Sequence, residues 1–286
     1  MISGIINVNK PEGITSFQVV SLIKKKLGIK RVGHLGTLDP AGCGVLPIAV
    51  NKATKLFDYY LNKRKTYRAI FYFGKETDTL DSFGKVINTY DKIINMADLI
   101  DECHKMCGIQ EQMPPKYSAK SINGIRAYEL ARSNVEFELK PKKVEIFNFK
   151  VVEKLKTNLY LFEIECSAGC YIRSICRDLA KRLGTVAYMP LIIRVKAGDF
   201  AIDSSVDYCE LQKSENIESY INDIACCLKL DKITFNEVNT KKLKSGQCLY
   251  FNIADGNYLL LDNNNQAFAL GRVENNSLKM ERYLGD

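Results

Sequence analysis

A glycine-rich segment near the N-terminus holds an aspartate in a setting suited to chemistry. Four glycines lie within residues 33–44, and such a loop is costly in conformational entropy unless the backbone must turn tightly or lie close to a ligand. Asp39 precedes Pro40, which disfavours helical geometry at the aspartate and would project its carboxylate from a fixed turn. The alternative is an Asx turn, in which the carboxylate bonds its own backbone. The loop alone leaves both interpretations open.

Other catalytic motifs are incomplete. Residues 28–34 have the glycine spacing of a P-loop, but the Lys and Ser/Thr that would bind phosphates and magnesium do not follow. Residues 42–44 begin like a dinucleotide fingerprint, but Pro47 stands where the third glycine belongs. Neither G-x-S-x-G nor H-E-x-x-H occurs. The sequence therefore argues against kinase, dehydrogenase, hydrolase and zinc-protease functions.

The composition and net charge are compatible with several classes of protein. The 286 residues are 46% hydrophobic with a net charge of +8, which suits RNA, an acidic membrane face or plain solubility. The first residues lack a basic start followed by a long apolar run, so we expect no secretion signal, and no stretch approaches the roughly 20 apolar residues that cross a bilayer. The ten cysteines include no C-x-x-C pair, which favours reduced thiols. Cys103-His104-Cys107 has half of a zinc spacing but no second half. We expect a cytoplasmic protein without membrane contact or metal.

The hydrophobic pattern predicts mixed helices and strands. Thr15 and Gln18 fit a capping box for a helix that ends near Leu27, and a second helical stretch is expected around 49–61. Residues 65–73 alternate as a strand with Tyr67 on its buried face. Further predicted elements are a helix at 98–106, a partly extended basic arm at 112–143, a strand at 143–152 pairing with one at 159–166, and a helix at 171–183. Hairpins in several places favour an α+β fold.

The sequence pattern changes near Asp231, where short predicted strands separated by turns begin. We therefore expect two parts, a domain at 1–230 and a small β-rich module at 231–286.

Five blocks in the same order give this sequence a family resemblance. The segment Gly33–Pro47 resembles the signature of the TruB family, the bacterial tRNA pseudouridine-55 synthases. The other blocks are the K-P-x-G-x-T-S pattern in residues 9–16, the tyrosine strand and following turn in 65–81, the RNA-gripping thumb in 112–128, and the strand-to-helix turn in 166–173. Together they span roughly residues 4–200.

The resemblance implies roles for three catalytic residues. Asp39 would be the carboxylate that attacks the flipped uridine or its ribose. Arg173 would pair with Asp39, because a neighbouring cation keeps a carboxylate ionised. Tyr67 would stack on the flipped base and help to remove the C5 proton. Without the resemblance, Tyr67 on an apolar strand face would be assigned to the core. Arg173 near a helix start is poorly placed for the helix dipole, which hints at a carboxylate partner.

The resemblance also implies which residues line the substrate pocket and which residue fills the space that the flipped base leaves in the RNA. Tyr171 and Ile192 would line the base pocket, and His34 would fill the space that the base vacates, since flipping costs a few kcal/mol. Tyr171 has the alternative of simple packing at a helix start. Asp78 and Asp81 resemble a metal pair but are better explained as turn residues.

The expected activity is isomerisation of uridine-55 in the T loop of tRNA, on a mixed, mainly antiparallel pseudouridine-synthase sheet with flanking helices and a C-terminal PUA-like RNA-binding module. The reaction is redox-neutral, so no cofactor or metal is expected. The partner would be the tRNA T stem-loop and elbow, with no obligatory protein partner and a monomeric state.

The sequence departs from the family pattern at two positions. Cys170 stands where threonine is usual, and Ile193 replaces an arginine, which removes one charge near the expected RNA contacts. Two other functions compete. One is a non-catalytic RNA-folding protein that grips the tRNA elbow and needs no Asp39. The other is a uridine methyltransferase with a cysteine nucleophile, which would require a glycine-rich cofactor loop after a strand; we find none.

Overall fold

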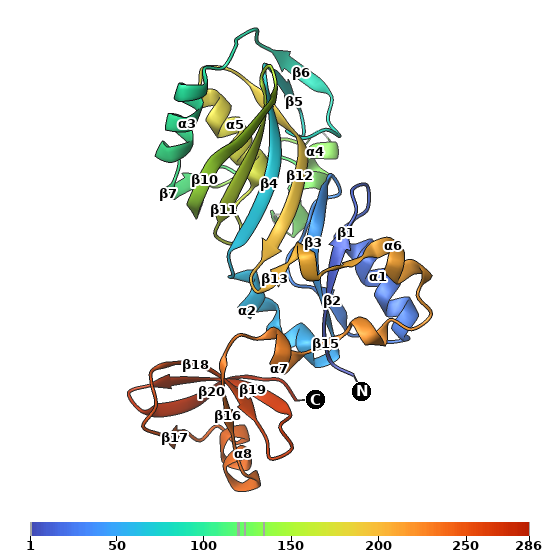
Figure 1. Ribbon diagram of the computed structural model, residues 1–286, viewed down its shortest axis with the longest axis vertical. Helices are drawn as coiled ribbons and strands as arrows, with labels where there is room; N and C mark the ends of the chain where they lie inside the picture. Colours follow the sequence, from blue (N-terminus) through green and yellow to red (C-terminus); the bar gives the residue numbers. More distant parts are fainter. Residues whose placement is uncertain (1, 119–120, 123, 134, 286) are drawn as a thin grey trace.

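The fold is built around two large β-sheets joined by a short connection, and two small two-stranded hairpins accompany them (Figure 1). The computed structural model describes residues 2–285 except 119, 120, 123 and 134, and leaves out the side chains of Ser121, Arg126 and Arg132. Parts of the predicted basic arm, Ala119, Lys120 and the Arg126 side chain, therefore lie outside the described residues. One sheet has eleven strands and the other has five.

The large sheet follows the order β14-β1-β3-β12-β4-β11-β10-β7, with β2 beside β3, β13 beside β12 and β15 beside β1. Two neighbouring pairs, β1–β14 and β3–β12, are parallel, and the remaining pairs are antiparallel. This confirms the predicted mixed, mainly antiparallel sheet. Its strands are β1 (Gly4–Lys10), β2 (Val32–His34), β3 (Gly42–Val50), β4 (Lys65–Phe73), β7 (Gly108–Gln112), β10 (Lys142–Lys156), β11 (Leu159–Cys166), β12 (Ala187–Ala197), β13 (Phe200–Ala201), β14 (Val206–Asp207) and β15 (Asn222–Asp223).

Helices and two small hairpins flank this sheet. Helix α1 (Ser16–Leu27) begins with the predicted capping box, in which Thr15 and Gln18 bond each other's backbone N–H, and Gly28 ends it in the left-handed conformation. The other helices are α2 (Phe57–Leu61), α3 (Met96–Lys105), α4 (Ala127–Arg132), α5 (Ile172–Arg182), α6 (Tyr208–Lys213) and α7 (Ile224–Cys227), with short 3-10 turns at Asn51–Leu56, Ile202–Ser204 and Glu218–Tyr220. The hairpins pair β5 (Lys75–Thr77) with β6 (Val86–Thr89) and β8 (Ser121–Ile122) with β9 (Ile125–Arg126).

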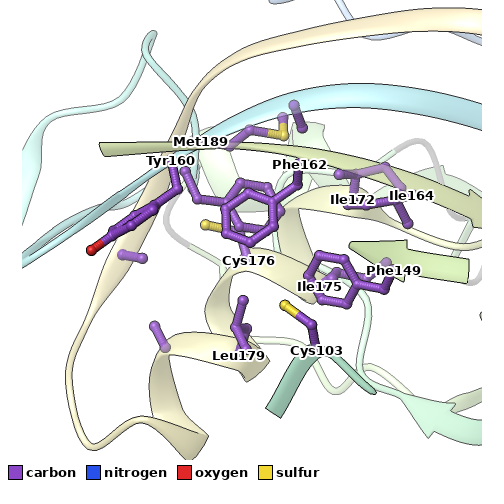
Figure 2. Packing of buried hydrophobic residues seen from close by; sticks show 14 of the residues in the cluster. Cys103, Phe149, Tyr160, Phe162, Ile164, Ile172, Ile175, Cys176, Leu179 and Met189 are labelled. Carbon is purple, nitrogen blue, oxygen red and sulfur yellow. The ribbon is translucent and has the colours of Figure 1, made fainter. Parts of the chain in front are cut away.

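Helices α3 and α5 pack on one face of the β4–β11–β10 region (Figure 1). The core between them is rich in aromatic side chains, and Phe71 and Phe162 have ring centroids 4.6 Å apart. Figure 2 shows Phe162 and Phe149 facing Cys176, Ile175 and Leu179 of α5. Full burial of each large apolar side chain contributes about 1.5–3 kcal/mol, so this layer holds α5 firmly against the sheet.

The C-terminal sheet has its own small core and shares a second one with the large sheet. Its strands are β16 (Asp231–Thr234), β17 (Leu249–Tyr250), β18 (Gly256–Leu261), β19 (Ala267–Glu274) and β20 (Ser277–Tyr283), with helix α8 (Glu237–Lys244), which the sequence did not predict. Leu259, Leu261, Leu270 and Leu284 join Leu56 and Tyr60 in one buried apolar cluster. An ion pair between Arg282 and Asp58, 2.7 Å apart, lies beside it. These contacts fix the C-terminal sheet against α2.

Two central strands were missed from the sequence. Helical structure was expected from residue 49, but strand β3 continues to Val50 and the 3-10 turn begins at Asn51. Strand β12 contains Pro190, and its pairing with β4 shifts register between Tyr188 and Leu191. Proline in a central strand requires such an irregularity because it lacks the N–H of the ladder.

Within the described residues, none of the helices is long and apolar enough to span a membrane.

Candidate active site

The loop that carries Asp39 connects β2 to β3 and is held by backbone bonds. The N–H of Gly42 donates to the carbonyl of Asp39 at 2.9 Å, closing a turn with Pro40 in its second position. The Ser16 hydroxyl, at the start of α1, both donates to the carbonyl and accepts from the N–H of Leu38, at 2.8 and 2.9 Å. The N–H of Gly13 donates to the Pro40 carbonyl at 2.9 Å. Asp39 is therefore carried by a fixed turn.

The carboxylate of Asp39 meets the guanidinium of Arg173. Nη2 of Arg173 lies 2.5 Å from Oδ2 of Asp39, and the side chain of Asp39 is 46% exposed while that of Arg173 is 6% exposed. One oxygen of this carboxylate therefore has Arg173 as its partner, a side-chain contact that the Asx-turn alternative does not provide. A buried cation with an accessible anion presents a fixed negative charge to a ligand.

Arg173 is itself held by several acceptors. Its Nη1 donates to the carbonyl of Thr79 at 3.0 Å, and Nη2 donates to the carbonyl of Tyr117 at 2.9 Å. Oδ2 of Asp81 lies 3.5 Å from Nη1, with the Asp81 side chain 9% exposed. The same aspartate accepts from the Thr79 hydroxyl at 2.6 Å and from the Phe83 N–H at 3.0 Å. Asp81 is thus the turn residue that was predicted, but it also places a second carboxylate behind Arg173.

Tyr67 lies on the buried face of β4, as the alternation predicted. Burial raises the pKa of its phenol to about 12, although the nearby Arg194 cation acts in the opposite direction. Tyr67 is therefore a neutral phenol at physiological pH. It pairs in register with Arg194 of β12, which pairs on its other side with Gly44 of β3. One row across three strands therefore carries the tyrosine, the arginine and Gly44, the third residue of the strand that follows the Asp39 loop.

Arg194 is a buried cation that the sequence did not single out. Arg194 as a whole is only 2% exposed to solvent. Nε donates to the carbonyl of Val45 at 2.7 Å, Nη1 to that of Thr37 at 3.0 Å and Nη2 to that of Gly36 at 3.1 Å. Gly44 permits this approach, because a Cβ there would lie 2.4 Å from the carbonyl oxygen of Arg194 and its φ is +101°. Arg194 therefore fixes both sides of the loop that carries Asp39.

Tyr171 and Gln112 bring the predicted thumb segment to the site. Tyr171 is the N-cap residue of α5. The amide side chain of Gln112, at the end of β7, accepts from the Tyr171 N–H at 2.8 Å and donates to the Tyr171 carbonyl at 3.1 Å. Such a two-point clamp fixes the peptide, and Gln112 was not assigned this role from the sequence. The clamp also sets the start of the arm that follows Gln112.

Most of the predicted site residues meet at a cleft with a volume of about 410 Å³. Asp39, Tyr67, Tyr171, Arg173 and Ile192 all line it. The structure therefore brings together five of the six residues predicted for the site.

The sixth predicted residue, His34, lies on β2 and is not among the described residues that line the cleft. Burial lowers the pKa of its imidazole, Arg194 acts in the same direction, and its Nδ1 has no hydrogen-bond partner among the described residues. His34 is therefore a neutral side chain beside the loop.

The two departures from the family pattern have different positions. Cys170 lines the cleft, and its sulfur lies 3.7 Å from Nε2 of Gln112. Ile193 is half-buried between its register partners Cys43 and Arg68. Because side chains alternate along a strand, Ile193 points to the face opposite Ile192 and Arg194. Replacement of an arginine by Ile193 therefore changes the far face of β12.

The half-zinc spacing at residues 103–107 does not form a cluster. Cys103 is 1% exposed in the core, and burial raises the pKa of its thiol to about 12, which disfavours the thiolate that binds metals. Over the part of the chain that the structure describes, no group of three or more His, Cys, Asp or Glu side chains gathers around a common point.

Comparison with known proteins agrees with this site and fold. Residues 24–172 match the family described as TruB family pseudouridylate synthase (N terminal domain). The tRNA pseudouridine synthase B of Caldanaerobacter subterraneus subsp. tengcongensis is 34% identical over 98% of this chain and 99% of its own. Those of Clostridium tetani and Aquifex aeolicus are 42% and 37% identical, each over 85% of this chain, with 84% and 86% of their own chains covered.

Solved structures show the same fold. A chain in a structure titled "Crystal Structure of a Cbf5-Nop10-Gar1 Complex" has a TM-score of 0.71 and 23% identity, over 99% of this chain and 85% of that one. A chain of an H/ACA RNP bound to a substrate RNA that contains 2′-deoxyuridine has a TM-score of 0.71 and 22% identity, with 99% and 85% coverage. The sheet and its flanking helices thus define a pseudouridine-synthase fold. With the family match and the identities above, the chain belongs to the TruB family.

Proposed function

We propose that this protein converts uridine-55 in the T loop of tRNA to pseudouridine by flipping the nucleotide into the cleft, with Asp39 as the nucleophile. The observation that carries the proposal is the accessible Asp39 carboxylate, 2.5 Å from the buried Arg173 at the wall of a cleft that also contains Tyr67. The family's relatives named tRNA pseudouridine synthase B support the choice of tRNA as substrate.

The proposed reaction needs only groups that the cleft supplies. The glycosidic bond between N1 and C1′ breaks, the uracil turns within the cleft, and a bond forms between C5 and C1′. C5 then loses a proton and N1 gains one, so the product is an isomer of the substrate. Asp39 would attack either C6 of the base or C1′ of the ribose, and both routes use the same ionised carboxylate. In the first route the bond between Asp39 and C6 breaks again after C5 has bonded to C1′. In the second, the carboxylate displaces N1 from C1′ and is then displaced by C5, so Asp39 is regenerated either way. No redox cofactor enters this balance.

The other side chains are proposed to hold and orient the base. Tyr67 and Ile192, on β4 and β12, would contact its faces, and Tyr171 would close the cleft at the start of α5. The neutral phenol of Tyr67 has one proton to donate and lone pairs to accept, so it would assist departure of the C5 proton through a hydrogen bond. His34, kept neutral by burial, would occupy space in the T loop from beside the cleft.

We further propose that residues 231–286 act as a PUA-like RNA-binding module next to a catalytic domain formed by 1–230, with residues 112–143 as the arm over the RNA. The separate five-stranded sheet supports this division. The proposed working unit is a cytoplasmic monomer that needs the tRNA T stem-loop and elbow but no protein partner.

The direct experiment is to incubate purified protein with unmodified tRNA, without any cofactor, and to assay pseudouridine chemically. The proposal requires product at the T-loop uridine and none in a tRNA that carries cytidine there. A protein that binds and folds tRNA without forming product would instead support the RNA-folding alternative.

Asp81 is expected to act as a positioning residue. Asp81→Asn keeps the shape of the turn but removes the negative charge 3.5 Å from Arg173. We expect the single-turnover rate to fall by about tenfold or more, because a small misplacement of a catalytic group is costly, while RNA affinity stays within about threefold of wild type. Asp78→Asn, in the same turn but exposed, is the matched control and should retain the wild-type rate. Equal rates for all three proteins would remove Asp81 from this role.

Binding of tRNA is expected to depend steeply on salt. With a net charge of +8, the protein should release counterions from several phosphates, and the Kd should rise roughly 100-fold between 50 and 200 mM salt, the value for about four phosphate contacts. Filter binding or fluorescence anisotropy at five salt concentrations gives the slope. A flat response would contradict RNA as the partner.

A further inference from the structure

The cleft contains more positive charge than the pairing of Asp39 with Arg173 requires. Its described lining residues include four cationic side chains and one carboxylate, Asp39. Arg173 binds Asp39, and Arg194 donates to three backbone carbonyls. The other two cations are Lys65 and Lys142. Within the described part of the chain, neither of them forms an ion pair with a carboxylate. Their charges remain available to an anion that enters the cleft.

Lys65 is the more deeply placed of the two lysines. It is the first residue of β4 and is 7% exposed. Its ammonium donates to the carbonyl of Leu61, the last residue of α2, at 2.6 Å. An ammonium has three donors, so two are left for a ligand in the cleft. Burial, together with the like charge of the neighbouring Arg194, lowers the pKa of Lys65 to about 8.

Lys142 reaches the cleft from the start of β10. Its ammonium lies over Gly169, where an added Cβ would be 2.1 Å from Nζ, and Gly169 has a φ of +75°. The end of β11 lies between the ends of β4 and β10 that carry the lysines, since Cys166 pairs with Lys65 of β4 and also with Ile146, four residues along β10 from Lys142. Lys65 and Lys142 are therefore at the same end of the sheet and on the same cleft, one buried and one exposed.

We propose that Lys65 and Lys142 together bind one of the two backbone phosphates that flank the flipped uridine. This assignment rests on the proposed function, because it takes the flipped nucleotide as the occupant of the cleft. Uracil is uncharged and cannot compensate the two ammonium groups, whereas a phosphate offers several anionic acceptor oxygens to point charges of this kind. Phosphate contacts fix register without reading sequence, so this pair would hold the nucleotide while the base turns.

The test pairs a change in the protein with a change in the RNA. A labelled T-arm RNA carries a neutral methylphosphonate in place of the phosphate on the 5′ side of the target uridine, and a second RNA carries it on the 3′ side. Each has a 2′-O-methyl group on the preceding sugar, and matched RNAs carry the same sugar with a charged phosphate. Fluorescence anisotropy gives the Kd for the wild-type chain, Lys65→Met, Lys142→Gln and Lys156→Gln, and the chemical assay gives turnover.

One of the two methylphosphonates should weaken binding to the wild-type protein about tenfold, the loss expected for a charge-assisted contact. Lys142→Gln should weaken binding of the charged RNA, and its Kd should change clearly less than that of the wild type on that methylphosphonate, because only Lys65 then contacts the phosphate. Lys156, exposed at the other end of β10, is the matched control, and Lys156→Gln should respond to the methylphosphonate as the wild type does.

The experiment also separates phosphate binding from a purely structural role. If Lys65 only stabilises the end of α2, Lys65→Met would lower stability but remain fully sensitive to both methylphosphonates. Lys142 is exposed, so Lys142→Gln should fold normally and decides the matter if Lys65→Met does not fold. Full sensitivity of Lys142→Gln to both methylphosphonates would overturn the proposal. Absence of pseudouridine with the wild-type chain would instead reject the proposed function, since the binding measurements do not depend on turnover.

Discussion

Replacement of Asp39 by asparagine is expected to abolish pseudouridine formation while leaving the protein folded and able to bind tRNA. Asparagine has the shape of aspartate, and its oxygen can still accept from Nη2 of Arg173, now 2.5 Å from the carboxylate. It lacks the anionic oxygen that the proposed attack requires. We expect the single-turnover rate to fall by about four orders of magnitude or more. The measurement is a single-turnover assay with enzyme in excess over unmodified tRNA.

The control for this variant must show that the loop is intact. The Kd for tRNA should stay within about threefold of wild type, and the thermal midpoint within a few degrees. Asp78→Asn removes an exposed carboxylate in the nearby turn and should turn over normally. Product from Asp39→Asn at the wild-type rate would overturn the assignment of the nucleophile, and with it the main proposal.

Of the substitutions considered for this protein, replacement of Arg194 by methionine should lower the free energy of unfolding most. Methionine fills similar space but leaves the carbonyls of Gly36, Thr37 and Val45 without their donors in a site where the residue is 2% exposed. A buried unsatisfied group costs roughly 1–3 kcal/mol, and entering water would relieve part of it. We therefore expect the free energy of unfolding to fall by about 3 kcal/mol, as measured by denaturant titration.

The same substitution should also reduce activity, because Arg194 fixes the loop that carries Asp39. We expect a loss of about 100-fold in the single-turnover rate, since displacement by about 1 Å is enough for an effect of that size. Arg194→Lys keeps the charge with fewer bonds and should be intermediate in both measurements. Arg68→Met, on the exposed side of β4 next to Glu163, should change stability by less than about 1 kcal/mol. Wild-type behaviour of Arg194→Met would show that the three carbonyl contacts are dispensable.

Local sequence signals predicted the elements whose pattern is set by near neighbours. The capping box at Thr15 and the alternation through Tyr67 both depend on residues a few positions away, and both are present in the structure. The fold class followed from such elements together with the family resemblance. That resemblance also named Asp39 and Arg173, whose pairing across 134 residues no local pattern could have supplied.

The missed features share a dependence on distant parts of the chain. Strand β3 contains glycine and proline, and β12 contains a proline, so neither has the composition of a central strand, yet tertiary pairing places them side by side. Arg194 was passed over because its three acceptors are known only once that pairing is known. Asp81 was predicted to be a turn residue and is one. Its contact with Arg173 could not be predicted locally, because Arg173 belongs to a helix far along the chain.

The position of β12 between β3 and β4 has a consequence for synthesis of the protein. Thr37 and Arg194 are 157 residues apart in the chain, and β3 and β4 are joined in the sheet only through β12. A growing polypeptide that has left the ribosome as far as α5 already contains Asp39, Tyr67 and Arg173 but lacks the strand that aligns them. Closing so long a loop comes late in folding. The nascent enzyme should therefore stay inactive until the last central strand is inserted.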